Sequence, residues 1–418
     1  MELVPCPLSC QSSNEESNFQ SDSTHHHSDS SSTSSLASLA SLLSQQDHHP
    51  STTTHHHHCM ISTIKAHSSA VFSLSLAGKH LYSGSSDSQI RVWSLDPSSI
   101  TTSPEKIAAS GNSAVKSMVV SGGKLFSAHQ DHKIRVWKID NDSVPYQRYK
   151  LIATLPRFSD RVTTLFSGKN YVRIRRHKKS TWVHHVDAVS AMALSKDGSL
   201  LYSVSWDRTF KVWRSSDFKC LESVWNAHED AINALAFSGD GFLYTGSADK
   251  TIKVWKKREG DKNSKHELAA VLEKHTSAVN ALALSTDGSV LYSGACDRSI
   301  IVWERDHGGC GPHMTVAGTL RGHSKAVLCL ATVSDDLVCS GSADKTVRVW
   351  KRGMGKSYSC LAVVEGHGNP VKCLAAAAKG SDGDRNGESA SSSGTCFLVY
   401  SGSLDGYLMV TQVMVRSL

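Results

Sequence analysis

The stretch LYSGSSDSQIRVW, residues 81–93, decides the fold of this chain. Apolar and polar residues alternate with a period of two at both of its ends, and a polar segment separates the two ends. This pattern is typical of two β-strands joined by a turn. Within the stretch, Asp87 lies six residues before Trp93, and Ser83 lies four residues before Asp87. We therefore expect a β-hairpin that carries these three side chains at fixed positions.

The same spacing recurs along the chain, and a fixed period of this size indicates stacked repeats. Six units pair an Asp with a Trp: Asp87 and Trp93, Asp131 and Trp137, Asp207 and Trp213, Asp249 and Trp255, Asp297 and Trp303, and Asp344 and Trp350. A seventh unit has Asp405, with Thr411 in the place of the Trp. All seven units have a Ser or Thr four residues before the Asp: Ser83, Ser127, Ser203, Thr245, Ser293, Ser340 and Ser401.

A His, usually about twenty residues before the Asp, marks six of the units: His67, His185, His228, His275, His323 and His367. The second unit has Gly111 at this place, and we expect Asn112 to replace the imidazole in part. An apolar alternation follows each His, which predicts a further strand. Six units also have a Tyr or Phe directly before the Ser or Thr, on the sheet face that a neighbouring unit would bury: Tyr82, Phe126, Tyr202, Tyr244, Tyr292 and Tyr400.

Together these residues resemble the repeats of the WD40 family over residues 60–418. In that family, units of about 40 to 45 residues each form one four-stranded blade. The resemblance implies an all-β fold, a seven-bladed β-propeller with a buried hydrogen-bond network of His, Ser or Thr, Asp and Trp. Five units have the full set: His67, Ser83, Asp87 and Trp93; His185, Ser203, Asp207 and Trp213; His228, Thr245, Asp249 and Trp255; His275, Ser293, Asp297 and Trp303; and His323, Ser340, Asp344 and Trp350.

The last unit is one strand short, because its third apolar segment, Tyr407 to Val413, is followed by only a few residues. A strand-like segment, Met60 to Lys65, precedes the first His. Pairing of these two segments would close the ring, and ring closure removes exposed sheet edges. We therefore expect residues 59–418 to form a seven-bladed propeller that an N-terminal outer strand closes.

Residues 1–58 are rich in Ser, Thr and His and contain no Lys or Arg, which predicts a disordered tail. Two His runs in this tail lack the Cys or carboxylate spacing of a metal site, so we predict no metal. Two segments interrupt the repeats, a basic insertion at about 157–180 and a Gly- and Ser-rich loop at about 379–395. The second segment is also predicted to be disordered.

The charge of the chain is distributed unevenly. The tail has six carboxylates, whereas the whole chain has a net charge of +7, which leaves about +13 on residues 59–418. A basic propeller attracts acidic partners. The charge by itself does not choose among acidic peptides, phosphosites and nucleic acid. As partners we expect acidic or phosphorylated segments of other proteins, transcription regulators among them, rather than nucleic acid as the direct ligand.

Cysteine usage and hydropathy bear on the compartment. The eleven cysteines are odd in number and scattered, which is typical of a reducing compartment. We find no signal peptide and no apolar run of membrane-span length. We therefore expect a monomeric propeller in the cytoplasm or the nucleus.

The basic insertion is the most individual part of the chain. It contains a run of basic residues, Arg173, Arg175, Arg176, Lys178 and Lys179. Such a run is typical of a solvated loop, of a patch for a partner or phosphate, or of a nuclear-localisation signal, and the sequence leaves these open. It also leaves open whether Lys150 to Leu155 or Ser180 to His184 is the outer strand before the third blade.

With the repeated Leu-Tyr-Ser-Gly segments, this insertion resembles the plant JINGUBANG-type branch of WD40 proteins, which are cytoplasmic and nuclear regulators. The resemblance implies a plant regulatory adaptor that acts through partner proteins in pollen or growth signalling.

Propellers of the WD40 family bind partners on their top face, through the residues three and five positions after the His and the residue before the Asp. The first set is small in this chain, being Ala in six units and Pro370 in the seventh. The other two sets give the candidate partner-binding residues: Phe72, Lys116, Gln130, Trp206, Asn233, Asn280, Leu328 and Lys372. An exposed Trp206 beside Lys116 and Gln130 would form a binding hot spot.

These features favour a non-enzymatic interaction scaffold or regulatory adaptor. A His, Ser and Asp can build the nucleophile of a hydrolase, but an active site needs one such trio and here it recurs in most units. We find no Gly-rich phosphate loop, so we predict no cofactor. Two alternatives stay open: an RNA- or chromatin-associated subunit, because of the basic charge, and a ubiquitin-ligase substrate receptor, although the Trp-Asp-x-Arg sequence of such receptors is absent.

Overall fold

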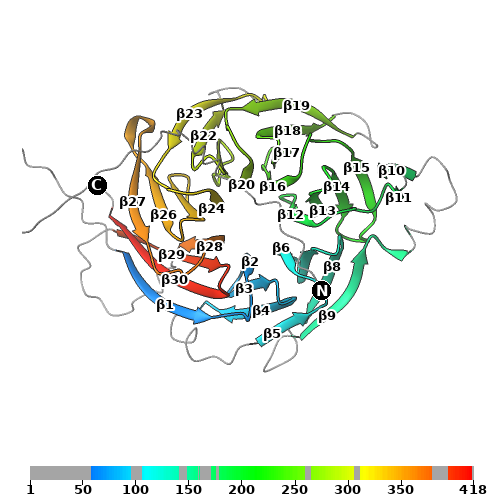
Figure 1. Ribbon diagram of the computed structural model, residues 1–418, viewed down its shortest axis with the longest axis horizontal. Helices are drawn as coiled ribbons and strands as arrows, with labels where there is room; N and C mark the ends of the chain where they lie inside the picture. Colours follow the sequence, from blue (N-terminus) through cyan, green and yellow to red (C-terminus); the bar gives the residue numbers. More distant parts are fainter. Residues whose placement is uncertain are drawn as a thin grey trace, which may run out of the picture. The chain divides into compact units, whose positions relative to one another are not determined.

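A computed structural model describes residues 58–95, 106–140, 148–158, 160, 171–175, 178–258, 265–305, 311–378 and 394–416, all within one compact unit that begins at His56. Seven antiparallel four-stranded sheets stand as blades around a central axis (Figure 1). The predicted all-β, seven-bladed propeller is thus confirmed.

The strands of the first three blades have the following bounds. Blade 1 contains β2 (Val71–Ala77), β3 (His80–Ser85), β4 (Gln89–Ser94) and β5 (Lys106–Ser110). Blade 2 contains β6 (Val115–Ser121), β7 (Lys124–His129), β8 (Ile134–Asp140) and β9 (Arg148–Leu155). Blade 3 contains β12 (Val189–Leu194), β13 (Leu200–Ser205), β14 (Phe210–Arg214) and β15 (Cys220–Val224).

The remaining blades follow the same order from the inner to the outer strand. Blade 4 contains β16 (Ile232–Phe237), β17 (Phe242–Ser247), β18 (Thr251–Lys257) and β19 (His266–Glu273). Blade 5 contains β20 (Val279–Leu284), β21 (Val290–Ala295), β22 (Ile300–Arg305) and β23 (Met314–Leu320). Blade 6 contains β24 (Val327–Thr332), β25 (Leu337–Ser342), β26 (Val347–Arg352) and β27 (Tyr358–Val364), with a 3-10 turn, η2 (Met354–Lys356), before its outer strand.

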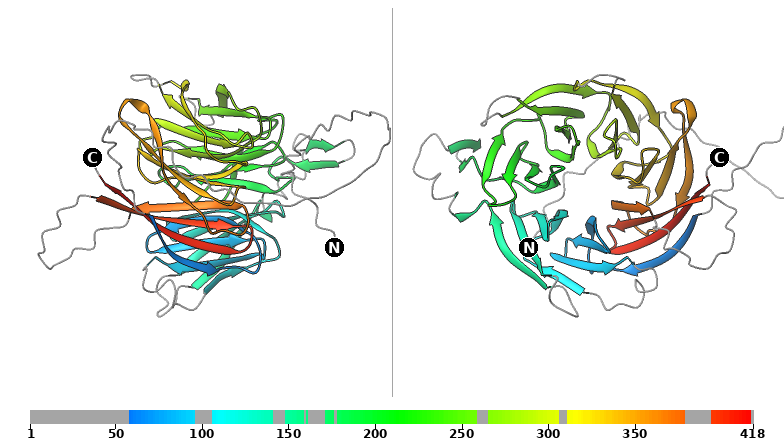
Figure 2. Two further views of the ribbon diagram at one scale, coloured as in Figure 1. Left: turned by 60° about the vertical axis from the view of Figure 1, so that its left-hand side comes forward. Right: turned by 180° about the vertical axis from the view of Figure 1, so that it is seen from behind.

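Blade 7 joins the two ends of the described chain. It contains β28 (Val371–Ala378), β29 (Gly394–Ser403) and β30 (Tyr407–Arg416), and its outer strand is β1 (His58–Lys65). β1 runs antiparallel to β30, with Lys65 opposite Tyr407 and His58 opposite Val413 (Figure 2). The expected closure of the ring by an N-terminal strand is confirmed.

Neighbouring blades pack through positions that the repeat fixes. The six aromatic residues before the Ser or Thr are all nearly inaccessible to solvent, at most 2% exposed. The Gly after the Ser or Thr allows close approach: a Cβ added at Gly294 would lie 2.6 Å from Val327 Cγ1, on the inner strand of the next blade. This contact explains why a Gly follows the Ser or Thr in most of the repeats, because a larger residue would push the two blades apart.

The structure resolves which segment precedes the third blade. Arg148–Leu155 is β9, the outer strand of blade 2, where it pairs with β8. The basic insertion contributes a separate hairpin of β10 (Tyr171–Arg175) and β11 (Lys178–Thr181), which pair with each other at the periphery of the ring (Figures 1 and 2). The outer strand is therefore the segment that contains Lys150 to Leu155.

The predicted tail before His58 and most of the predicted loop at 379–395 lie outside the described residues. Gly394 and Thr395, at the end of that loop segment, belong to β29. Within the described part of the chain, no helix has the length and hydrophobicity needed to cross a lipid bilayer.

Candidate interaction face

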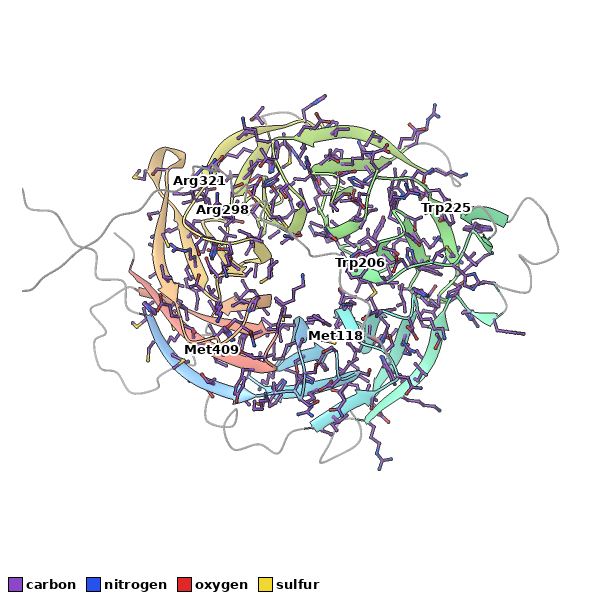
Figure 3. The ribbon with its side chains drawn as sticks, viewed as in Figure 1. Met118, Trp206, Trp225, Arg298, Arg321 and Met409 are labelled. Carbon is purple, nitrogen blue, oxygen red and sulfur yellow. The ribbon has the colours of Figure 1, made fainter. Side chains whose placement is uncertain are left out.

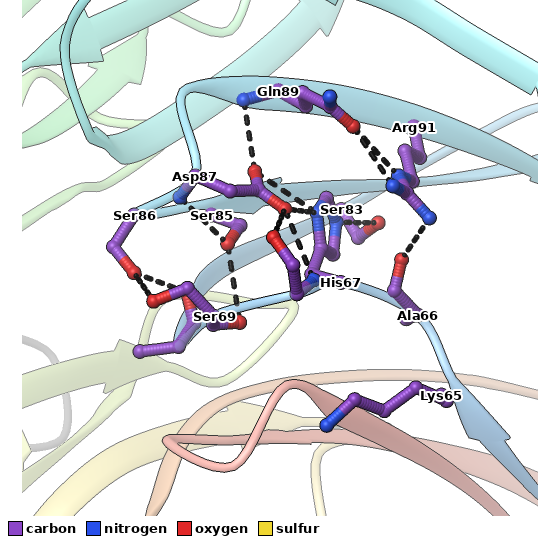
Figure 4. Close-up of polar contacts among 12 residues, drawn as sticks. Lys65, Ala66, His67, Ser69, Ser83, Ser85, Ser86, Asp87, Gln89 and Arg91 are labelled. Carbon is purple, nitrogen blue, oxygen red and sulfur yellow. Dashed lines mark hydrogen bonds and ion pairs between the residues drawn. The ribbon is translucent and has the colours of Figure 1, made fainter.

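The polar network of blade 1 shows how each repeat fixes its turn (Figure 4). Trp93 Nε1 donates to Ser83 Oγ at 2.9 Å, and Ser83 Oγ lies 2.8 Å from His67 Nε2. The other ring nitrogen of His67, Nδ1, lies 3.0 Å from Asp87 Oδ2. Because the indole nitrogen can only donate, the donors run from Trp through Ser and His to Asp. The carboxylate also accepts from the backbone N–H of Gln89 at 3.0 Å, which holds the turn between β3 and β4.

Blades 3 to 6 repeat this arrangement. Their imidazole Nδ1 atoms lie 3.3, 2.8, 2.8 and 2.9 Å from an Oδ2 atom of Asp207, Asp249, Asp297 and Asp344, respectively. Burial alone would raise the pKa of Asp249, but hydrogen bonds from His228 and Thr251 outweigh it and hold this pKa below its usual value. The structure therefore brings together all five predicted sets, each as a hydrogen-bonded unit inside one blade.

Blade 2 obtains its imidazole from a residue that the sequence did not single out. In His129, on β7, the Nε2 atom lies 2.8 Å from Ser127 Oγ. The same hydroxyl accepts a hydrogen bond from Trp137 Nε1 at 2.9 Å. His129 Nδ1 lies 3.1 Å from the carbonyl oxygen of Ser113. Burial, assisted by the charge of Arg135, lowers the pKa of His129 to about 4, so the buried ring is neutral.

The expectation that Asn112 replaces the missing imidazole is wrong, because Asn112 is exposed. Asp131, without an imidazole to bind, instead forms an ion pair with Arg135 at 2.7 Å. Among the seven units, only this one has a His two residues after the Ser or Thr of the repeat. This difference is the sequence feature from which His129 could have been predicted.

Blade 7 has an incomplete network. His367 Nε2 lies 2.7 Å from Ser401 Oγ, but Nδ1 of the same ring is buried without a hydrogen-bond partner among the described residues. Asp405 accepts from the backbone N–H groups of Gly368 and Tyr407. The position of the Trp is taken by Thr411, which is buried. This blade therefore keeps the turn but lacks the His–Asp hydrogen bond.

The His–Asp pairs and the turns they hold lie at one face of the ring, which we call the polar face. Here the residue after each Asp has a positive φ, in the left-handed region: Ser88, His132, Arg208, Lys250, Arg298, Lys345 and Gly406, with φ between 66° and 84°. The predicted partner-binding residues belong to this face, because they stand either before the same Asp or at the start of an inner strand.

Three of the predicted residues meet across three successive blades. Lys116 Nζ, from β6, lies 3.9 Å from the ring centroid of Phe72, on β2, and 5.4 Å from that of Trp206. Trp206 stands in the turn after β13 and is labelled in Figure 3. All three side chains are half-buried. Cation–π attraction thus holds an ammonium group between two aromatic rings at the inner edge of the polar face.

The corresponding positions of blades 3 to 5 are used differently. Ser190 donates to the carbonyl oxygen of Ile232 at 2.5 Å, Asn233 to that of Val279 at 3.0 Å, and Asn280 to that of Val327 at 2.9 Å. Each of these bonds ties one inner strand to the next blade. Asn280 and Leu328 are each 7% exposed, whereas Lys372 is half-buried and Gln130 is exposed. The accessible part of the predicted set therefore centres on blades 1 to 3.

The basic insertion places its charges on both strands of the β10–β11 hairpin. Arg173 stands opposite Lys179 in the register, and Arg175 stands opposite Lys178, whereas Arg176 lies outside the described residues. The register therefore concentrates four basic residues on a hairpin that no other described strand pairs with.

The described residues contain no group of three or more His, Cys, Asp and Glu side chains that could hold a metal ion. The recurring Ser or Thr, His and Asp side chains form the hydrogen bonds that hold the turns. The Ser and Thr residues lie in the blade interior and are 0% to 2% exposed. This arrangement supports binding at the polar face, since it rigidifies seven turns that present side chains to solvent.

Five segments of the chain match the model of the family described as WD domain, G-beta repeat: residues 58–94, 176–214, 218–256, 266–304 and 314–351. They correspond to blades 1 and 3 to 6, which have the complete His–Ser/Thr–Asp–Trp networks. The three inner strands of blades 2 and 7, whose networks depart from the pattern, lie outside the matched segments. The chain therefore contains WD40 repeats, and the repeated network and the closed seven-bladed ring support a WD40-repeat protein.

Proposed function

We propose that this protein is a non-enzymatic interaction scaffold whose polar face binds partner proteins at the Phe72–Lys116–Trp206 cluster. The WD40 propeller supports a scaffold or adaptor role, because its repeats hold a rigid surface. The observation that carries the proposal is the position of the Lys116 ammonium between two aromatic rings from neighbouring blades.

The chemistry of this cluster suits a protein partner. Aromatic and basic side chains dominate the binding energy of many interfaces, and they do so where rigid neighbours hold them in place. Phe72 and Lys116 stand on inner strands of adjacent blades, so the cluster is preorganised and loses little conformational freedom on binding. A partner carboxylate or phosphate can bind Lys116, while its apolar groups cover the two rings.

We further propose the finer identity that the resemblance implies, a plant regulatory adaptor in the cytoplasm or nucleus that acts on acidic or phosphorylated segments of partner proteins. The basic hairpin of β10 and β11, together with the Leu-Tyr-Ser-Gly segments, supports this assignment.

Affinity capture from the native tissue tests the scaffold function. The wild type is compared with the variant Phe72→Ala/Lys116→Ala/Trp206→Ala, each with and without nuclease treatment. The control is Leu268→Ala/Val271→Ala, which removes exposed apolar side chains from the outer strand β19. We expect a set of proteins that the wild type and the control retain and the cluster variant loses. Identical capture by all three proteins would refute the role of the cluster.

A second function, association with RNA or chromatin, is favoured by one observation, the four basic residues on the β10–β11 hairpin. Binding of this kind depends steeply on salt, because it releases counterions from phosphates. Capture that nuclease abolishes, and that the cluster variant leaves unchanged, would favour this second function over the first.

A further inference from the structure

A second part of the polar face, on blades 5 and 6, carries four exposed basic side chains: Arg298, Arg321, Lys325 and Lys345. We call these residues the basic arc. Within the described part of the chain, none of the four forms an ion pair with a carboxylate. Figure 3 labels Arg298 and Arg321 in the same sector of the ring, away from Trp206.

Strand register places the two arginines at the same end of blade 5. Ile300, at the start of β22, pairs with Leu320, at the end of β23. Arg321 directly follows Leu320, and Arg298 stands two residues before Ile300. Both arginines therefore lie at the end of the β22–β23 strand pair that faces the polar face.

Hydrogen bonds place the two lysines together on blade 6. Ser342 Oγ donates to the carbonyl oxygen of Lys325 at 3.1 Å, and Ser324 N donates to Asp344 Oδ2 at 3.0 Å. Lys345 follows Asp344 in the same turn. Blades 5 and 6 are in turn joined by the Asn280–Val327 hydrogen bond, and Arg321 and Lys325 stand in the one segment that connects β23 to β24.

A further cation lies beneath this surface. A Cβ added at Gly322, between Arg321 and His323, would lie 2.9 Å from Nη1 of Arg348. The glycine thus allows a third guanidinium to approach the loop that carries Arg321. Burial lowers the pKa of His323, and the nearby charge of Arg348 adds to this effect. Burial and this charge therefore favour the neutral form of the His323 ring.

The carboxylates of this region do not cancel the arc. Asp297 and Asp344 are 12% and 8% exposed, respectively, and both are bound to an imidazole and to backbone N–H groups. Exposed carboxylates stand at its two borders, Glu273 at the end of β19 and Glu365 after β27. The turn carboxylates of blades 5 and 6 are therefore shielded from solvent, whereas the four basic side chains of the arc are exposed.

Two residues of the arc occupy a backbone conformation that favours glycine or asparagine. Arg298 has φ 68° and Lys345 has φ 73°, whereas blade 7 has Gly406 at the same turn position. The turns of blades 1 to 6 all have a residue other than glycine in this conformation, so it is a property of the turn. Replacement of Arg298 or Lys345 by Asn therefore keeps the turn, because Asn tolerates the left-handed region.

We propose that the basic arc binds an acid-rich peptide segment of a partner protein, with the carboxylates of successive residues on Arg298, Arg321, Lys325 and Lys345. This inference rests on the proposed scaffold function and adds a second contact surface to it. The four cations come from different turns and loops, so they suit carboxylates distributed along a peptide better than the concentrated charge of one phosphate. Binding of single-stranded nucleic acid would require exposed aromatic rings among the cations, and the arc itself contains none.

The test measures fluorescence anisotropy of a labelled oligoglutamate peptide of about ten residues, roughly 30 Å when extended, titrated with the full chain at low and physiological salt. The arc variant is Arg298→Asn/Arg321→Gln/Lys325→Gln/Lys345→Asn. The matched control is Ser88→Asn/His132→Asn, which places the same residue in the same left-handed turn position of blades 1 and 2 without removing a Lys or Arg charge.

We expect the arc variant to bind the peptide at least about tenfold more weakly than the wild type, a loss of about 1.4 kcal/mol. The control is expected to bind within about twofold of the wild type. Because Asn tolerates the left-handed region, thermal unfolding of the arc variant should occur at the same or a higher temperature than that of the wild type. Equal peptide affinity of the arc variant and the wild type would overturn the proposal.

Two further probes separate the proposal from its alternatives. A phosphoserine peptide without Glu, or an oligouridylate of equal length, that binds the arc more tightly than oligoglutamate would also overturn it. The Phe72→Ala/Lys116→Ala/Trp206→Ala variant should still bind oligoglutamate. If that cluster variant loses its partners from tissue while the arc variant binds the peptide normally, the scaffold function stands and the arc inference fails.

Discussion

His129 Nε2 lies 2.8 Å from Oγ of Ser127, two residues earlier on the same strand. In blades 1 and 3 to 7, the equivalent Ser or Thr binds an imidazole from the segment before the inner strand. The hydroxyl is at most 2% exposed in every blade. Each blade therefore places an imidazole beside this buried hydroxyl, but the imidazole does not have to come from one place in the chain.

The first prediction concerns this histidine. His129→Ala should lower the free energy of unfolding by about 1 to 3 kcal/mol, because Ser127 loses a buried partner. Asn112→Ala, which changes an exposed side chain in the same blade, should have an effect within about 0.5 kcal/mol of zero. Urea unfolding of both variants measures the difference. Equal stability of the two variants would show that His129 does not support the network.

The second prediction is a dependence of stability on pH. The pKa of His129 falls from 6.5 in the unfolded chain to about 4 in the folded chain, because burial disfavours its charged form. The unfolded state therefore takes up the proton first as the pH falls. The contribution of His129 to the free energy of unfolding is therefore fully present above pH 6.5 and is lost progressively as the pH falls from 6.5 to 4. Unfolding temperatures over this range should decrease more for the wild type than for His129→Asn, and parallel curves would contradict the assignment.

The third prediction compares two aspartates at the same repeat position. Asp249 accepts from His228 Nδ1 at 2.8 Å, Glu229 N at 3.0 Å, and Thr251 N and Oγ1 at 2.9 and 2.7 Å. Asp405 accepts only from two backbone N–H groups, among the described contacts. Asp249→Ala should therefore cost about 1 to 3 kcal/mol of unfolding free energy, and Asp405→Ala should cost less. Calorimetry of both variants tests the order, and the reverse order would show that the imidazole contributes little.

The fourth prediction concerns ring closure. β1 pairs with β30 from His58 to Lys65, and Lys65 Nζ also donates to the carbonyl oxygen of Asp405 at 2.9 Å. A chain that begins at residue 59 should fold, because it keeps almost all of this pairing. A chain that begins at residue 67 should unfold at a much lower temperature or aggregate, since β30 becomes an exposed edge. Circular dichroism melting of the two chains, side by side with the full chain, measures the contribution of β1, and indistinguishable melts would disprove it.

The sequence by itself determined the blade number, the strand order within each repeat and the closing strand. These features are local: the period-two alternation, the Asp-to-Trp spacing and the polar turns recur within short windows, so each hairpin is specified by its own residues. The sequence predicted an exposed Trp206 beside Lys116, because both repeat positions share one face. Trp206 does lie near Lys116 but is half-buried, and the contact of Lys116 with Phe72 was not predicted.

Only the tertiary structure decided which residues from different segments come together in one hydrogen-bond network or on one part of the polar face. His129 replaces the missing imidazole because its strand brings it back beside Ser113, a contact that no fixed spacing encodes. Asn280 and Leu328, expected at the binding face, are almost buried, and Asn280 donates a hydrogen bond to Val327 on the next inner strand. The partition of the polar face into an aromatic cluster and a basic arc depends in the same way on the order of blades around the ring. That order brings together side chains far apart in the sequence, and it follows from closing the ring.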